Sequence, residues 1–166
     1  MKIILTTVFC FFLFLDNING QENKHAFNLI ISIDNKIVTG NLSNIKINVK
    51  QKTGNQVFIE SEYYPGNLSI TKTNYDFLKS ADVEKVFFTF NYTKFCNKLR
   101  KDINYEIEIN KDWLDNYFYV LKIYNTNNPN FSKIFYPLKG KKYTFETSSP
   151  NGNITRVRKK SLSDCF

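Results

Sequence analysis

Hydrophobic and polar residues alternate with a period of two through much of the chain. Ile45, Ile47 and Val49 are separated by Lys and Asn residues, and residues 103–110 alternate in the same way. Because successive side chains of a strand point to opposite faces of a sheet, each run places its apolar residues on one face. Both runs are therefore predicted to be strands with one buried face.

Turn residues separate further segments that are rich in strand-favouring residues. The turn at 53–55 is followed by residues 56–64, which are predicted to form a hairpin with the strand before them. A turn is also predicted at 139–141 and a loop at 125–130. The other predicted strands are residues 26–34, 86–92, 117–124, 131–136 and 142–147.

One short helix is predicted at residues 75–80, with Asn74 as its N-cap and Asp76 in its first turn. Residues 112–116 are predicted to form a single helical turn. About seven to nine short strands separated by turns favour an all-β fold over an α/β fold. We expect an antiparallel β-sandwich of the immunoglobulin-like or fibronectin-like kind, with at most one or two short helices. A small β-barrel is the alternative.

The N-terminal segment 1–20 is predicted to be a signal peptide. Lys2 precedes the apolar run 3–15, and a polar stretch that ends at Gly20 follows it. The run is shorter than the roughly 20 residues of a membrane-spanning helix and has the length of the apolar part of a signal peptide. A buried helix of the mature fold is the alternative. We expect residues 21–166 to be secreted as one β-rich domain with no transmembrane segment.

Two cysteines, Cys96 and Cys165, remain when Cys10 is removed with the signal peptide. An oxidising compartment favours a disulfide between them, with an intermolecular bond as the alternative. Closing so long a loop stabilises a fold by about 4 kcal/mol in the chain-entropy picture.

Five Asn-X-Ser/Thr sequences are candidates for glycosylation in a secreted chain, and a modified Asn has to face solvent. The candidates are Asn41, Asn67, Asn91, Asn130 and Asn153.

The chain is basic, with 23 Lys and Arg against 15 Asp and Glu, a net charge of +8. Two local clusters stand out, and the second lies in the basic C-terminal tail 148–166. Such clusters are suited to acidic glycans or a membrane surface, whereas nucleic acid is a poor partner for a secreted chain. A solvated tail and a protease cleavage site are alternatives for the second cluster. The candidate basic surface residues are Lys139, Lys141, Lys142, Arg156, Arg158, Lys159 and Lys160.

Catalytic groups are scarce in the sequence. The only histidine, His25, lies in a polar stretch near the mature N-terminus, where a solvated residue is expected. Two acidic pairs, Glu60 with Glu62 and Glu106 with Glu108, are the only candidates for a carboxylate enzyme, and solvated strand faces have the same spacing. The sequence indicates no metal site and no cofactor.

The aromatic content of 16 Phe, 10 Tyr and one Trp is typical of a packed β core, although a barrel or loose sandwich with such residues could enclose a small apolar ligand. Trp113 lies in the polar stretch 111–116. It is either an exposed anchor for a partner protein or a cap that folds inward over the core.

These features favour a secreted, non-enzymatic glycoprotein that acts as an extracellular binding module. We expect it to bind another protein or a polyanionic extracellular surface through its loops and its basic C-terminal region. A carrier of a small apolar ligand is the alternative, followed by a carboxylate-site enzyme.

Overall fold

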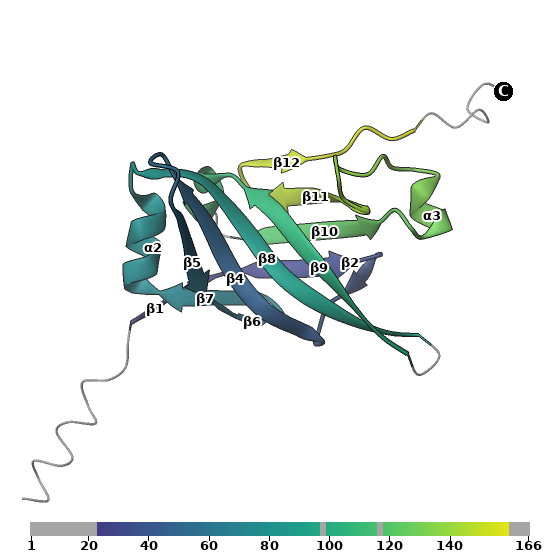
Figure 1. Ribbon diagram of the computed structural model, residues 1–166, viewed down its shortest axis with the longest axis horizontal. Coiled ribbons are helices and arrows are strands. Elements are labelled where there is room, and N and C mark those ends of the chain that lie inside the picture. The colour runs from purple at the N-terminus through teal and green to yellow at the C-terminus, as the bar shows by residue number, and fades with distance from the viewer. Residues whose placement is uncertain (1–22, 97–98, 116–117, 160–166) are drawn as a thin grey trace, which may run out of the picture.

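The computed structural model describes residues 23–96, 99–115 and 118–159 (Figure 1). The predicted signal peptide, Lys160 and Cys165 lie outside these residues. Signal cleavage and the Cys96–Cys165 disulfide therefore stay predictions.

The described strands form three sheets (Figure 1). A four-stranded sheet has the order β5-β4-β8-β9, a five-stranded sheet has the order β12-β11-β10-β2-β3, and a three-stranded sheet has the order β1-β7-β6. The strands are β1 (Lys24–Phe27), β2 (Leu29–Ile33), β3 (Lys36–Ile37), β4 (Leu42–Gln51), β5 (Gln56–Glu60), β6 (Glu62–Tyr64), β7 (Asn67–Thr71), β8 (Val83–Cys96), β9 (Leu99–Ile109), β10 (Tyr119–Asn125), β11 (Tyr143–Ser149) and β12 (Gly152–Ile154).

One hydrophobic core receives side chains from all three sheets. In Figure 1 the strands β4, β8 and β9 run obliquely in front of β2 and β10. Phe88 of β8, Ile31 of β2 and Ile70 of β7 are buried in the same cluster, and Tyr105 and Phe90 are among its fully buried side chains. The prediction of a mostly β fold is confirmed.

One pairing departs from the predicted antiparallel arrangement. Strands β2 and β10 run parallel, with Ile31 opposite Leu121, whereas every other pair of described strands is antiparallel. Alternation shows which face of a strand is buried but not the direction of its neighbour, so the parallel pair could not be foreseen. None of the three sheets closes on itself within the described residues.

Two predicted strands are each divided between two sheets. Residues 26–34 are interrupted at Asn28, which separates β1 from β2, and residues 56–64 are interrupted at Ser61, which separates β5 from β6. Strands β3, β7 and β12 were not predicted, because each is short and lies close to turn residues.

Two helical segments lie close to their predicted positions, but Asp76 was wrongly placed in the first turn of the first one, which holds no acidic residue. Helix α2 (Lys72–Lys79) begins earlier than predicted, and Thr71 rather than Asn74 is its N-cap, since the Thr71 Oγ1 accepts from the Asn74 backbone N–H at 3.2 Å. The 3₁₀ turn η1 (Lys111–Asp115) takes the place of the single turn predicted at 112–116.

The strand predicted at 131–136 is wrong, because helix α3 (Pro129–Ser132) begins just before it. The Asn128 side chain caps this helix by accepting from the Asn130 backbone N–H, and Pro129 suits the first turn. Phe131 and Phe135 are four residues apart, a helical spacing, and both are buried against Tyr124.

Candidate functional site

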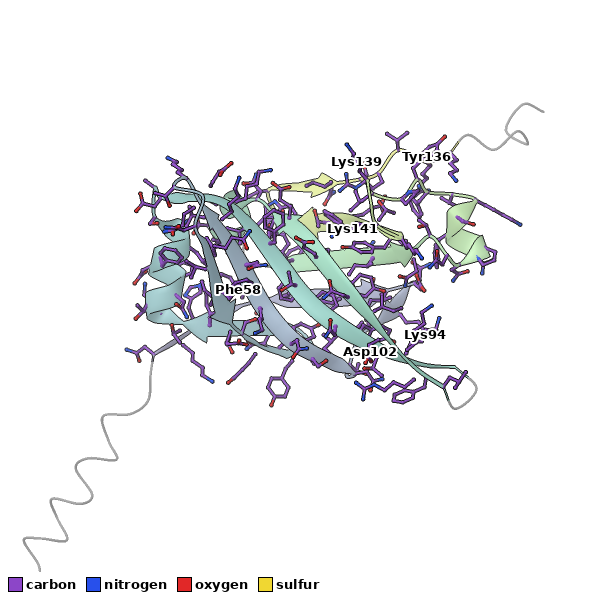
Figure 2. The ribbon with its side chains drawn as sticks, in the orientation of Figure 1. Phe58, Lys94, Asp102, Tyr136, Lys139 and Lys141 are labelled. Carbon is purple, nitrogen blue, oxygen red and sulfur yellow. The ribbon has the colours of Figure 1, made fainter. Side chains whose placement is uncertain are left out.

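A groove of about 760 Å³ lies between the β8–β9 hairpin, the two ends of the connection from β10 to β11 and the turn after β2. Figure 2 shows Lys94 and Asp102 on the hairpin and Lys141 on the turn before β11. The charged residues of its wall are four lysines and two aspartates: Lys94, Lys101, Lys141, Lys142, Asp34 and Asp102. The groove is therefore more basic than acidic.

Strand pairing sets the positions of the hairpin residues. Lys94 of β8 lies opposite Lys101 of β9, and the next pair along the ladder is Thr93 opposite Asp102. The turn before β11 supplies the other lysines, where Gly140 has a φ of +72° and the Lys141 N–H donates to the Leu138 carbonyl at 3.0 Å. The pairing of β8 with β9 and the turn before β11 therefore bring residues about forty positions apart to one groove.

Only some of these charges are balanced. Lys141 pairs with Glu106 at 2.5 Å, and the hydrogen bond to this carboxylate raises the pKa of Lys141. Hydrogen bonds, first from Arg100 and then from Thr93, hold the pKa of Asp102 below its usual range. Within the described residues, Lys94, Lys101 and Lys142 have no ion-pair partner.

A hydrogen-bond network holds the floor of the groove. Both oxygens of Asp34 accept from Asn125, at 2.8 Å from its backbone N–H and 3.1 Å from its Nδ2. The hydroxyl of the buried Tyr105 donates to the Asn125 Oδ1 at 2.8 Å. Burial raises the pKa of Tyr105, so this hydroxyl keeps its proton. Both oxygens of Asp34 are thus used within the fold, whereas Lys94, Lys101 and Lys142 are exposed to solvent.

A second hollow of about 400 Å³ adjoins the groove. The two share Asp34, Lys94, Asn125 and Asn128 as lining residues, and the second hollow adds Lys36 from the start of β3. We call the larger space the groove and the smaller one the side hollow.

The C-terminal basic residues contact their own fold instead. The Arg156 Nε donates to the Phe145 carbonyl at 2.9 Å, and its guanidinium lies 4.6 Å from the centroid of the Phe145 ring. The Arg156 backbone N–H donates to the buried Glu146 at 3.1 Å. The Lys159 Nζ donates to the Ser132 carbonyl at 2.7 Å. The first part of the predicted tail is therefore held against β11 and the α3 region.

The predicted basic surface residues are thus divided. Lys141 and Lys142 line the groove, and Lys139 is exposed on the same turn. Arg156 and Lys159 are held as described, and Arg158 lies over the ring of Phe135 at 5.8 Å. Sequence reasoning missed the groove residues Lys94 and Lys101. The signal that could have found them is the density of basic residues in 94–101, which holds Arg100 and one further lysine, Lys98.

The predicted acidic pairs do not converge on one pocket. Glu60 pairs with Lys46 and Glu62 with Lys24, on strands of different sheets. Glu106 and Glu108 are ion-paired with Lys141 and Lys85. Within the described residues, no three His, Cys, Asp or Glu side chains are grouped to hold a metal ion.

His25 belongs to β1 rather than to a free end. Its ring stacks on Tyr75 at a centroid distance of 3.7 Å and contacts the edge of Phe27. Burial, and next the charge of Lys72, lower the pKa of His25 below its ordinary 6.5.

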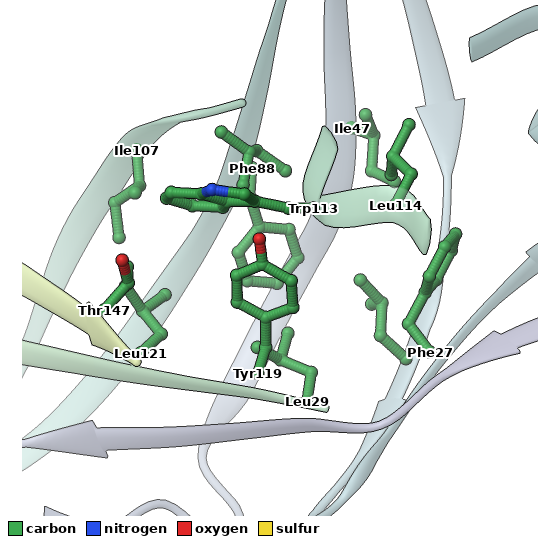
Figure 3. Close-up of a pocket in the computed structure, with 12 residues that line it drawn as sticks. Phe27, Leu29, Ile47, Phe88, Ile107, Trp113, Leu114, Tyr119, Leu121 and Thr147 are labelled. Carbon is green, nitrogen blue, oxygen red and sulfur yellow. The ribbon is translucent and has the colours of Figure 1, made fainter. Parts of the chain in front are cut away.

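Trp113 folds inward, the second of its two predicted alternatives. It is half-buried against the core and lies 4.8 Å from Tyr119, ring to ring (Figure 3). It lines an apolar cavity of about 50 Å³ together with Phe27, Phe88 and Leu121. Sites for drug-sized ligands measure roughly 300–1,000 Å³, so this cavity is several times smaller than such a site.

The candidate glycosylation sites differ in exposure. Asn41, Asn67, Asn130 and Asn153 are exposed. Asn91 is half-buried on β8, and its Oδ1 accepts from the Asn104 Nδ2 at 2.9 Å.

Comparisons of the chain with protein-family models, with curated proteins and with solved structures find no match. In the part of the chain that the structure describes, no helix has the length and apolar character to cross a membrane.

Proposed function

We propose that this chain is a secreted, non-enzymatic binding protein whose groove holds a polyanionic extracellular ligand. One observation carries the proposal: Lys94, Lys101 and Lys142 line one open groove and have no ion-pair partner among the described residues. An anionic ligand would supply the missing partners.

The geometry favours binding in this groove over other basic surfaces. The lysines project from a paired hairpin and a tight turn, and the floor is fixed by the Asp34–Asn125 network. The backbone that carries the lysines is therefore already ordered, and binding has to order mainly their side chains. The overall charge of +8 would also speed the approach of an anionic partner at low ionic strength.

The proposal includes the finer assignments made from the sequence: cleavage of residues 1–20, glycosylation, the Cys96–Cys165 disulfide and an immunoglobulin-like or fibronectin-like sandwich. Two sheets that face each other across one core support the sandwich. In such folds the loops at one end form the binding surface, and the groove is built from a hairpin and loops of this kind. The carrier alternative gains no support from a cavity of about 50 Å³.

The test measures the affinity of the secreted chain for a fluorescent sulfated polysaccharide by anisotropy. The variant Lys94→Gln/Lys142→Gln is compared with Lys52→Gln/Lys122→Gln. The second variant also removes two positive charges, from exposed lysines outside the groove. Exposed ion pairs contribute about 0.2–1 kcal/mol each, so the groove variant should bind roughly twofold to thirtyfold more weakly.

Rising salt should lower the affinity of the unmodified protein for the polysaccharide. The control variant should retain nearly all of that affinity. Equal losses in both variants would show that overall charge, rather than the groove, drives binding. No binding of any polyanion by the unmodified protein would remove the proposal.

A further inference from the structure

The groove and the side hollow adjoin, and most of the residues that line them are polar. Four residues line both spaces, and among them Lys94 stands at the junction. A ligand that enters from the groove and passes Lys94 would therefore reach the side hollow without leaving the protein surface.

Positive charge is distributed along this surface. Lys36 lies in the side hollow, Lys94 at the junction and Lys142 in the groove. Within the described residues, none of the three has an ion-pair partner. Cations spread over two adjoining spaces match an anion with repeated charges better than a single compact phosphate.

Amide side chains supply much of the remaining lining. Asn104, Asn127 and Asn128 line the groove, and Asn35 and Asn130 line the side hollow. An amide both donates and accepts hydrogen bonds, as a sugar hydroxyl does. Each amide can therefore bind a sugar hydroxyl either as donor or as acceptor.

The walls of the two spaces suit nucleic acids and peptides less well than sugars. Tyr143 and Phe131 are buried and Tyr92 is half-buried, so the walls offer no exposed ring on which a base would stack. Peptide grooves use open sheet edges or apolar pockets for side chains. Strand β9 is an edge strand beside the groove, but the lining side chains are mostly lysine and amide, which favours a sugar polyanion over a peptide.

We propose that the ligand is a linear acidic polysaccharide that spans the groove and the side hollow, with Lys94 at the crossing point. This inference rests on the proposed function and adds to it the chemical class of the ligand and the requirement that it reach both spaces.

The experiment measures the affinity of size-defined sulfated oligosaccharides by calorimetry, with a tetrasaccharide and a decasaccharide as probes. The variants are Lys36→Gln in the side hollow, Lys142→Gln in the groove and Lys52→Gln as the charge-matched control. Thermal unfolding midpoints check that all three variants are folded. A polyglutamate peptide with the charge of the decasaccharide is the competing ligand.

The decasaccharide should bind more tightly than the tetrasaccharide, because a longer chain contacts the lysines of both spaces at once more readily. Lys142→Gln should lower the affinity for both probes, whereas Lys36→Gln should lower only the affinity for the decasaccharide, by roughly twofold to fivefold. Lys52→Gln should change neither.

Three results would overturn the inference while leaving the proposed function in place. The first is equal affinity for the two oligosaccharide lengths, and the second is an unchanged affinity of Lys36→Gln for the decasaccharide. The third is tighter binding of polyglutamate than of the decasaccharide. Failure of every polyanion to bind would remove the proposed function itself. The two failures are therefore distinguishable.

Discussion

Two regions of this molecule are both rich in Lys and Arg, but one is exposed to solvent and the other contacts its own fold. In the groove, Lys94, Lys101 and Lys142 face open space. In the C-terminal segment 156–159, Arg156 lies on Phe145 and donates to the Phe145 carbonyl, and Lys159 donates to the Ser132 carbonyl. The first set is available for a ligand, and the second stabilises the fold.

The difference teaches that a dense basic stretch is not by itself a binding surface. Arg and Lys have long apolar stems and several donors, so they can cover aromatic rings and satisfy carbonyls of their own chain. The predictions below separate the two roles, from the largest expected effect to the smallest.

The largest effect is expected where the C-terminal segment meets the satellite core of Tyr124, Phe131 and Phe135. Phe135 is 4% exposed, stacks on Tyr124 and forms a β-bridge with Arg158. Phe135→Ala should lower the free energy of unfolding by about 3–5 kcal/mol, measured by urea denaturation. The adjacent Tyr136 is 60% exposed, so Tyr136→Ala should cost less than about 1 kcal/mol. Equal costs for the two variants would contradict this account of the segment.

A smaller loss of stability is expected from Arg156→Ala. The change removes the hydrogen bond to the Phe145 carbonyl and the contact with its ring. These two interactions together are worth about 1–2.5 kcal/mol, which urea denaturation can resolve. The same variant should bind the sulfated polysaccharide with nearly unchanged affinity. A large loss of affinity with intact stability would instead place Arg156 in the binding surface.

The sequon at Asn130 links glycosylation to the groove, because Asn130 lines the side hollow. If this site carries a glycan, the glycan competes for the space of the ligand. Asn130→Gln should then raise the affinity of the glycoprotein for a long acidic oligosaccharide by less than about tenfold, or 1.4 kcal/mol. Asn153→Gln is the control, since Asn153 lies on β12 and lines neither space. Equal effects of the two variants would contradict the assignment of the side hollow.

The smallest effect is expected at β1, which lies at the opposite end of the molecule from α3 (Figure 1). The pKa of His25 is lower in the folded state than its ordinary 6.5, so the unfolded chain binds more protons as the pH falls. The stabilising contribution is therefore present above the unfolded pKa and is lost as the pH falls through the folded pKa.

His25→Phe should reduce the loss of stability measured by urea denaturation between about pH 7.5 and 5, and should leave ligand affinity unchanged over that range. An unaltered pH profile would show that His25 does not contribute in this way.

Much of the fold was predictable because alternation is a local signal. The runs around Ile47 and Tyr105 became β4 and β9 with their apolar residues buried. The error at Phe131–Phe135 arose because aromatic residues favour strands, while the Asn128 cap and the Pro129 start of α3 favour a helix. The parallel direction of β2 and β10 depends on tertiary packing, which a local pattern does not record.

The candidate site was predictable only in part. Lys141 and Lys142 were found as a cluster in the sequence, but their neighbours Lys94 and Lys101 lie about forty residues away. The availability of a lysine depends on which carboxylates, carbonyls and rings the fold brings to it. Arg156 and Lys159 looked equally available in the sequence, and the contacts that hold them come from β11 and α3.

The most direct test of the central claim measures affinity and stability side by side for two charge-matched variants. Lys94→Gln/Lys142→Gln should lose affinity for the sulfated polysaccharide and keep its free energy of unfolding. Arg156→Gln/Arg158→Gln should lose stability and keep its affinity. If the C-terminal variant loses affinity while the groove variant keeps it, the groove is not the binding site and the account is contradicted.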